Sequence, residues 1–401
     1  MKIFINILFF VYGVFSFNTT FAQIRISSDF EHGSIGSLKE IKENVFTGQT
    51  MHWIKKDKIG NQYYWFYFKI SDVKGKTLSF ELRNMTGVYR NYPHEIFRNW
   101  VQPVLSYDNK NWNRINTVSY NDELKTFSFK VSFDKDTAWI AYAHPYTLSN
   151  ADTFIDLIKN DMNVQIENIG KSVEGRDIRL ITITNHVKSI KDKKVVMITA
   201  LQHSGEDCGG YLMEGVIKEL LADKQEMQAM RDNFIFKLIP VMNPDGLFHG
   251  TTRYNWNMED LNSKWDDDIS DTANMSLVPE VVAVKEWVKE WFSGGNRIDL
   301  FFDVHSNSQQ SKWNAFHNTD NTLKQFCDSL NNYWNLKYMS NGFKGSAVDY
   351  FTNHYKVPSA TIELTQSFVQ ENPGVYLNIG DYLNYGESLI YAIKDYFKYD
   401  K

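Results

Sequence analysis

A histidine and a glutamate three residues apart follow a short apolar run. His203 and Glu206 lie directly after residues 194–200, which predict a buried strand. The turn that leaves such a strand can aim both side chains at one ion. Zinc accepts imidazole nitrogen and carboxylate oxygen, and a catalytic zinc needs three protein ligands and one open position. The pair alone is a weak indication, because short patterns of this kind arise by chance.

A second histidine and a late glutamate extend this pattern. His305 ends the apolar run 300–304 and is the candidate third ligand, although a core histidine is its ordinary explanation. Glu363 lies inside the apolar run 360–364, where a carboxylate is costly to bury without a partner or a role. Three such segments, each at a predicted strand, favour metal-assisted hydrolysis. Glu363 would then be the general base for a metal-activated water and would pass the proton to the leaving amine.

Polar residues between these segments fit the surroundings of such a site. The turn Asn-Pro-Asp-Gly at 243–246 follows another strand-like run, and Arg253 comes shortly after it. An arginine near a hydrolytic metal stabilises the oxyanion of the tetrahedral intermediate. Asp260 is placed to accept a hydrogen bond from the free ring nitrogen of His203 and so to set its tautomer. Taken alone, Arg253 also fits an ordinary surface charge.

Alternating strands and helices must position these residues. The predicted strands are residues 194–200, 234–240, 300–304 and 360–364, and the predicted helices are residues 210–222, 278–292 and 382–397. This alternation indicates an α/β fold with a mixed, mostly parallel sheet flanked by helices. Open sheets of this kind place their sites beyond the carboxyl ends of the strands, where the candidate residues lie.

The first part of the chain has a different pattern, in which strands follow one another without helices between them. Residues 63–70, 77–83 and 126–131 read as strands separated by turn signals, and they predict a small antiparallel β-sandwich. We therefore expect an N-terminal β-sandwich domain at 23–147 and a catalytic domain at 148–401, and 401 residues suffice for both.

The N-terminus predicts a targeting segment. Lys2 precedes the largely apolar residues 3–17, and small residues before Gln23 resemble a cleavage site, so residues 1–22 are expected to be a signal peptide. A membrane anchor is the alternative, but the apolar core is short for a span. No later run of 18 apolar residues occurs, so no membrane span is expected after signal cleavage. The expected location is periplasmic or secreted.

The net charge limits the classes of binding partner, and the number of cysteines limits disulfide bonding. The net charge of −5 argues against nucleic acid as a partner. Cys208 and Cys327 are the two cysteines of the chain, too few for a disulfide framework, and two free buried thiols are favoured over a bond.

The order of these pieces resembles the zinc carboxypeptidase family. That family carries H-x-x-E, an N-P-D-G turn, an Arg, a D-x-N-R stretch, a strand-ending His and a late Glu on a strand. Here the pieces are, in order, residues 203–206, 243–246, Arg253, residues 260–263, His305 and Glu363. The resemblance covers about residue 147 to the C-terminus. The β-rich part that precedes it is similar to the leader domain of the cytosolic carboxypeptidase-like branch.

The resemblance implies one Zn²⁺ ion held by His203, Glu206 and His305, with Glu363 as general base and acid. It also implies that Arg253 polarises the carbonyl of a peptide or peptide-like substrate. By the same analogy, Asn262 helps to hold the terminal carboxylate of that substrate.

One position departs from the family pattern. The family has Arg after the Asn of D-x-N-R, whereas this chain has Ser263 followed by Lys264. Serine cannot make the bidentate charged contact that arginine makes with a carboxylate. The role of Tyr338 as a substrate-capping tyrosine stays open because its spacing fits poorly, and the side-chain pocket is expected near Val348 and Asp349.

Three functions remain in competition. The leading one is a zinc-dependent metallocarboxypeptidase that hydrolyses C-terminal peptide bonds. The second, motivated by Ser263, is a zinc amidase or endopeptidase-like hydrolase acting on cell-wall or modified peptides or esters without a free C-terminal carboxylate. The third is a binding protein: either one that binds sugar through the aromatic sandwich, with Tyr89, Tyr92, Phe97 and Trp100, or a hydrolase that has lost its activity.

Overall fold

The computed structural model describes residues 23–51, 54–55, 58–59, 64–85, 87–89, 92–94, 97–189, 191–369 and 372–398. The signal peptide predicted at 1–22 lies outside these residues, as do the side chains of Tyr89 and Tyr92.

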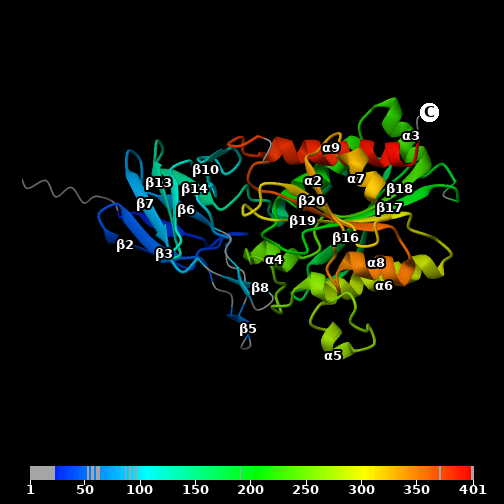
Figure 1. The fold of residues 1–401 in the computed structure, drawn as a ribbon, viewed down its shortest axis with the longest axis horizontal. Coiled ribbons are helices and arrows are strands. Elements are labelled where there is room, and N and C mark those ends of the chain that lie inside the picture. Colours follow the sequence, from blue (N-terminus) through cyan, green and yellow to red (C-terminus); the bar gives the residue numbers. More distant parts are fainter. Residues whose placement is uncertain are drawn as a thin grey trace, which may run out of the picture.

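Two five-stranded sheets form the first part of the described chain (Figure 1). One has the order β1 (Arg25–Ser27), β6 (Tyr67–Ser71), β14 (Thr137–Ala141), β10 (Val104–Ser106) and β11 (Trp112–Arg114). The other has the order β12 (Val118–Asn121), β13 (Thr126–Ser132), β7 (Thr77–Leu82), β3 (Val45–Gln49) and β2 (Ser37–Lys42). All pairs are antiparallel except β3 with β7. We call this part the N-terminal sandwich.

Aromatic rings fill the interior of the N-terminal sandwich. Along β13 the side chains alternate, so Phe127 and Phe129 point inward while their neighbours face outward. Phe80 packs on Phe129 with ring centroids 4.9 Å apart, and Phe97 packs on Phe127 at 4.8 Å. Phe97 is therefore a core residue, and its ring is not available to a sugar ligand.

Two short hairpins complete the β structure of this part. Strands β4 (Ile54–Lys55) and β5 (Lys58–Ile59) form one, and β8 (Gly87–Tyr89) and β9 (Tyr92–His94) form the other.

An eight-stranded sheet forms the centre of the remaining chain. Its order is β15 (Val164–Lys171), β16 (Asp177–Ile183), β18 (Phe234–Ile239), β17 (Lys194–Ala200), β19 (Leu300–Ser306), β22 (Ser359–Leu364), β20 (Asn314–His317) and β21 (Leu336–Met339). The four central strands β18, β17, β19 and β22 are mutually parallel, and antiparallel pairings flank them. The predicted mixed, mostly parallel α/β sheet behind a smaller β-sandwich is confirmed.

Helices cover both faces of this sheet (Figure 1). On one face lie α1 (Leu148–Ile158), α2 (Cys208–Leu220), α3 (Gln225–Asn233), α7 (Lys324–Leu330) and α9 (Ile379–Tyr396). On the other lie α6 (Pro279–Ser293) and α8 (Ala347–Tyr355), with the short α5 (Thr272–Met275) beyond them. Each face has its own apolar core, as a sheet buried on both sides requires. None of the described helices has the length and apolarity needed to cross a membrane.

Two glycines set the distance between α2 and α9. A Cβ atom added at Gly215 would lie 2.1 Å from the backbone oxygen of Leu383, and one added at Gly386 would lie 2.1 Å from that of Leu212. Each helix therefore approaches the backbone of the other where its own side chain is missing. Because α2 begins just after the turn that carries His203 and Glu206, this packing holds the turn against the sheet.

We expect Gly215→Ala to lower the free energy of unfolding by about 1–3 kcal/mol, because the new methyl group meets backbone that cannot move aside. Gly209→Ala on the same helix is the matched control, since its Cβ would meet the side chains of Ala200 and Val304 at 3.6 Å, an ordinary contact. Urea unfolding of both variants measures the difference. Equal stability of the two variants would show that the helix contact is not constrained by Gly215.

Candidate metal centre

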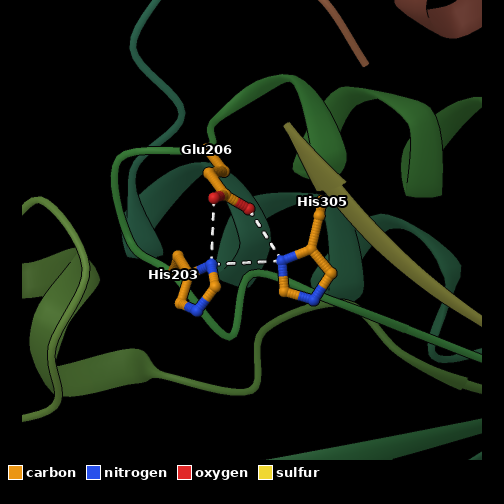
Figure 2. A group of neighbouring side chains, drawn as sticks. All are labelled: His203, Glu206 and His305. Carbon is orange, nitrogen blue, oxygen red and sulfur yellow. Dashed lines mark hydrogen bonds and ion pairs between the residues drawn. The ribbon is translucent and has the colours of Figure 1, made fainter. Parts of the chain in front are cut away.

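Three ligand atoms converge at one point between β17 and β19 (Figure 2). His203 Nδ1 lies 2.9 Å from Glu206 Oε1, and His305 Nδ1 lies 2.9 Å from Glu206 Oε2. The two Nδ1 atoms are 3.1 Å apart, and all three side chains are buried. Burial alone would raise the pKa of Glu206, but the two imidazoles lower it well below its ordinary value. Two imidazole nitrogens and a carboxylate form a ligand set that suits zinc.

The sheet brings these residues together. Ala200 of β17 is in register with Val304 of β19, so both strands deliver their next residues to the same edge. Leu201 then adopts a left-handed backbone conformation with φ 56°, which is rare for a leucine and turns the chain sharply. The Asn243 side chain donates to the Gln202 backbone oxygen at 3.2 Å, so the Asn-Pro-Asp-Gly turn braces the turn that carries the ligands.

Asp260 and Arg253 lie behind His203. His203 Nε2 is 3.1 Å from Asp260 Oδ1, and Arg253 Nε donates to Asp260 Oδ2 at 2.8 Å. Burial alone would raise the pKa of Asp260, but Arg253 and His203 hold it well below its ordinary value. An ionised Asp260 keeps the proton of His203 on Nε2 and leaves Nδ1 free for an ion. Arg253 Nη1 reaches to 3.3 Å from His203 Nδ1, so its guanidinium borders the point of convergence.

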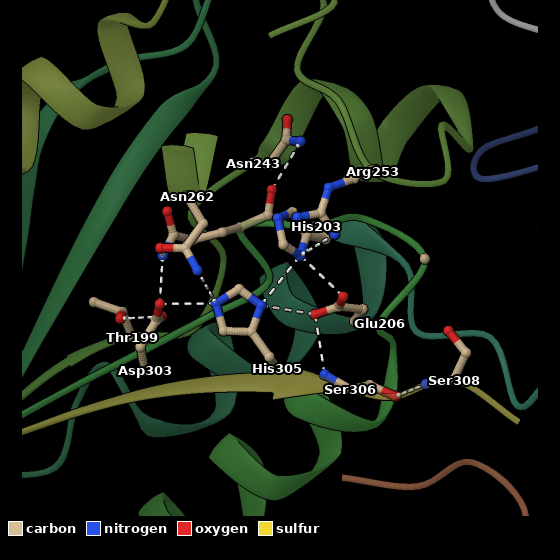
Figure 3. Close-up of polar contacts among 12 residues, drawn as sticks. Thr199, His203, Glu206, Asn243, Arg253, Asn262, Asp303, His305, Ser306 and Ser308 are labelled. Carbon is tan, nitrogen blue, oxygen red and sulfur yellow. Dashed lines mark hydrogen bonds and ion pairs between the residues drawn. The ribbon is translucent and has the colours of Figure 1, made fainter. Parts of the chain in front are cut away.

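Asp303 does the same for His305 (Figure 3). His305 Nε2 is 2.8 Å from Asp303 Oδ2, which also accepts from Gln202 Nε2 at 2.6 Å. Thr199 donates to the other oxygen of Asp303 at 2.7 Å. Burial would lower the pKa of His305, but Asp303 and Glu206 raise it well above its ordinary value. No sequence pattern assigned Asp303 a role, although an acid two residues before a strand-ending histidine lies on the same face of the strand.

Glu363 lies beside His305. The two residues are partners in the parallel register of β19 and β22, so their side chains emerge on the same face of the sheet. Burial, with the nearby charge of Glu206, raises the pKa of Glu363 to about 7, against the lowering effect of the histidines and Arg253. No hydrogen bond from another described residue holds its carboxyl group. This carboxyl group is therefore set to gain and lose a proton near neutral pH.

Asn262 is engaged inside the protein. Its Oδ1 accepts from Gln202 Nε2 at 3.2 Å and from the Ala347 backbone at 2.9 Å, and its Nδ2 lies 3.1 Å from His305 Nε2. This amide lies against the ring of His305.

The two residues after Asn262 are also occupied. The Ser263 hydroxyl donates to the Asp260 backbone oxygen at 2.8 Å. Lys264 Nζ lies 3.6 Å from a carboxylate oxygen of Glu259 and 3.6 Å from one of Asp267. The positive charge that follows Ser263 is thus compensated by two acids.

The other residues named from the sequence have contacts of their own or are buried. Tyr338 belongs to the edge strand β21 and donates to Asn321 Oδ1 at 2.8 Å. Asp349 of α8 accepts from Asn353 and from the Gly345 backbone, and Val348 is buried beside it. Cys208 and Cys327 are both buried and free.

The comparisons with known proteins cover both parts of the chain. Residues 153–372 match the zinc carboxypeptidase family model, and residues 26–143 match the model of the cytosolic carboxypeptidase N-terminal domain. Cytosolic carboxypeptidase 6 of Mus musculus is 27% identical over 296 residues, which cover 70% of this chain and 52% of that protein. Cytosolic carboxypeptidase 4 of Homo sapiens is 25% identical over 333 residues, which cover 72% of this chain and 28% of that protein. The chain thus spans between about a quarter and a half of the curated relatives that it matches.

A solved structure shares the whole fold. The crystal structure of a metallo-carboxypeptidase from Burkholderia cenocepacia superposes with a TM-score of 0.82 at 21% identity, covering 94% of this chain and all of that one. The family match confirms the resemblance to zinc carboxypeptidases, which are enzymes that use one zinc ion, and the structural match confirms the fold.

The predicted location is wrong. The curated relatives are named cytosolic carboxypeptidases, and the sandwich matches the N-terminal domain of that group. These names contradict the predicted periplasmic or secreted location. The prediction depended on a short apolar run and a few small residues, a pattern far less specific than a match over a folded domain.

A buried acid supports the loop that carries Arg253 and Asp260. Asn255 bridges this loop internally, and its Nδ2 donates to Glu280 Oε2 at 3.0 Å. Burial of Glu280 at the start of α6 raises its pKa from 4.5 to about 7, and the charge of Asp245 adds to this. Its other oxygen is buried and has no hydrogen-bond partner among the described atoms.

We expect Glu280→Gln to stabilise the protein at pH 8 and to have little effect at pH 5. Between these values the folded state keeps a proton on Glu280 that the unfolded state has lost, so the wild-type free energy of unfolding falls as pH rises. The difference from the variant reaches at most about 3 kcal/mol. Urea unfolding at both pH values measures it, with the exposed Glu286→Gln on the same helix as the control. A constant difference between pH 5 and 8 would exclude the raised pKa.

Proposed function

We propose that this chain, which belongs to the zinc carboxypeptidase family, is a zinc metallocarboxypeptidase that hydrolyses the C-terminal peptide bond of peptide substrates. The observation that carries the proposal is the convergence of His203, Glu206 and His305 beside Glu363 and Arg253. We assign catalysis to residues 148–401 and regard residues 23–147 as the preceding sandwich domain.

His203, Glu206 and His305 would hold the metal. Both histidines present Nδ1, because Asp260 and Asp303 occupy their Nε2 atoms. When bound, a zinc ion polarises the scissile carbonyl group and lowers the pKa of water.

The remaining chemistry belongs to Glu363 and Arg253. Glu363 takes a proton from the attacking water and passes it to the leaving amine, and a pKa near 7 suits both transfers. Arg253 stabilises the negative charge that develops on the carbonyl oxygen. Asp260 holds Arg253 and His203 at once, so the guanidinium keeps its place relative to the metal ligands.

A second candidate follows from the surroundings of Ser263. The family's arginine is absent there, and Lys264 is compensated by Glu259 and Asp267. These contacts favour a zinc amidase or endopeptidase-like hydrolase that accepts modified or cell-wall peptides, or esters, without a free terminal carboxylate. Both candidates use the same metal centre and the same general base, so they differ in substrate and not in chemistry.

We expect Glu363→Gln to lower kcat by roughly 10²- to 10⁴-fold, because the amide cannot take up a proton. Its zinc content, measured by mass spectrometry of the metal, should stay near that of the wild type. His305→Ala should lose both metal and activity, and Glu286→Gln should keep both. Full activity of Glu363→Gln would remove the general base from the proposal.

A peptide library synthesised with free and with amidated C-termini separates the two candidates. The carboxypeptidase proposal expects that only the free-ended peptides lose their last residue, read by mass spectrometry of the products. Equal cleavage of amidated peptides would reject it and favour the second candidate, because no terminal carboxylate would then be required.

A further inference from the structure

The N-terminal sandwich holds the loops that leave two strands of the metal centre. Arg114 ends β11, and its guanidinium contacts residues outside the sandwich. Its Nη2 donates to the backbone oxygens of Gln366 and Leu377, both at 2.9 Å. Its Nη1 donates to the Gln102 backbone oxygen at 2.9 Å and approaches Gln309 Oε1 at 3.4 Å. One guanidinium thus joins the sandwich to the loops that follow β19 and β22.

The partners of Arg114 are all neutral. No carboxylate lies within ion-pairing distance in the described part of the chain, and its Nε is buried without a hydrogen-bond partner among those atoms. Burial lowers the pKa of Arg114, so the charge is held away from water at a cost. If Arg114 only linked two surfaces, a neighbouring acid would reduce the free-energy cost of burying its charge. The rigid fork of a guanidinium, however, fixes several carbonyl groups at once.

The first path from Arg114 leads to the metal ligands through Gln366. Gln366 is fully buried and follows Glu363 by three residues. Its backbone nitrogen donates to the Ser308 oxygen at 2.9 Å, and its Nε2 donates to the Gly205 oxygen at 3.4 Å. Gly205 lies between His203 and Glu206. The carbonyl that Arg114 holds therefore belongs to a residue that touches the loop after His305 and the turn of the other two ligands.

The second path runs through Gln309, four residues after His305. Its backbone nitrogen donates to the Tyr142 hydroxyl at 3.0 Å, and its backbone oxygen accepts from Trp100 Nε1 at 3.0 Å. Its Oε1 accepts from the Gln102 backbone nitrogen at 2.9 Å. Gln309 is fully buried, and each of these partners belongs to the sandwich. Figure 3 shows Ser306 and Ser308 leading from His305 toward this loop.

We propose that Arg114 is a positioning residue for the metal centre, which keeps Glu363 and His305 in their mutual register by holding the loops after β22 and β19. The N-terminal sandwich then contributes to catalysis by holding the residues of the site in position. This inference rests on the proposed function for its kinetic readout, but the geometry of the metal centre can be measured without any substrate.

The test uses the full chain with Arg114→Met, Arg114→Lys and the control Arg83→Met, whose arginine lies on the sandwich surface beside Glu81. Arg114→Met should lower kcat by roughly 10- to 100-fold with KM changed less than about twofold, because the reacting groups are misplaced while substrate contacts remain. Arg114→Lys should recover part of kcat, since it keeps the charge and loses the fork. The visible absorption spectrum of the cobalt-substituted protein should change in Arg114→Met and stay unchanged in Arg83→Met.

Other outcomes overturn the inference. Wild-type kcat and an unchanged cobalt spectrum in Arg114→Met would do so, even if its melting temperature fell, because Arg114 would then serve stability alone. Should Arg114→Met not fold, Trp100→Phe removes one hydrogen bond to Gln309, and an unchanged kcat and spectrum there would count equally against the inference. Failure of the wild type to cleave any peptide would reject the proposed function, and the cobalt spectra would then decide on Arg114.

Discussion

Glu206 is a carboxylate that the fold removes from water, and the rest of the site is arranged around it. An imidazole lies 2.9 Å from each of its oxygens, and the Ser306 backbone nitrogen donates to Oε2 at 3.0 Å. Beyond the imidazoles stand Asp260 and Asp303, and beyond Asp260 stands Arg253. Carboxylates and nitrogen-bearing side chains therefore alternate outward from one buried acid. Removing any of them takes one partner from a buried polar neighbour, which costs more than the loss of a contact on the surface.

Parallel strand register gives this arrangement its precision. Strands β17, β19 and β22 lie side by side, and each contributes to the site at or just after its carboxyl end. The pairing of His305 with Glu363 is a property of the ladder, so a shift of one residue would move one side chain to the other face. Gln202 crosses between strands to reach Asp303, and Leu201 bears a left-handed conformation to place it. A strained backbone conformation of this kind persists where the surrounding contacts fix it.

The N-terminal sandwich contacts the eight-stranded sheet domain at the loops that follow β19 and β22. The eight-stranded sheet supplies the side chains of the candidate metal centre, and the loops after its central strands find some of their hydrogen-bond partners outside this sheet. The sandwich supplies these partners through Arg114, Trp100 and Tyr142. The aromatic content of the sandwich accordingly serves packing, and Trp100 uses its indole nitrogen in the contact.

The sequence by itself determined the segments of this protein: the strand-like runs, the helices between them, and the polar residues in or just after those runs, including His203, His305 and Glu363. Such features are local, since periodicity and turn residues act over a few positions. The N-terminal apolar run shows the limit of local patterns, because it predicted a location that the relatives contradict. Only the tertiary structure decided which groups complete the site. Asp303 and Arg114 find their partners across strands or domains, and register and side-chain direction, which no short pattern contains, select those contacts.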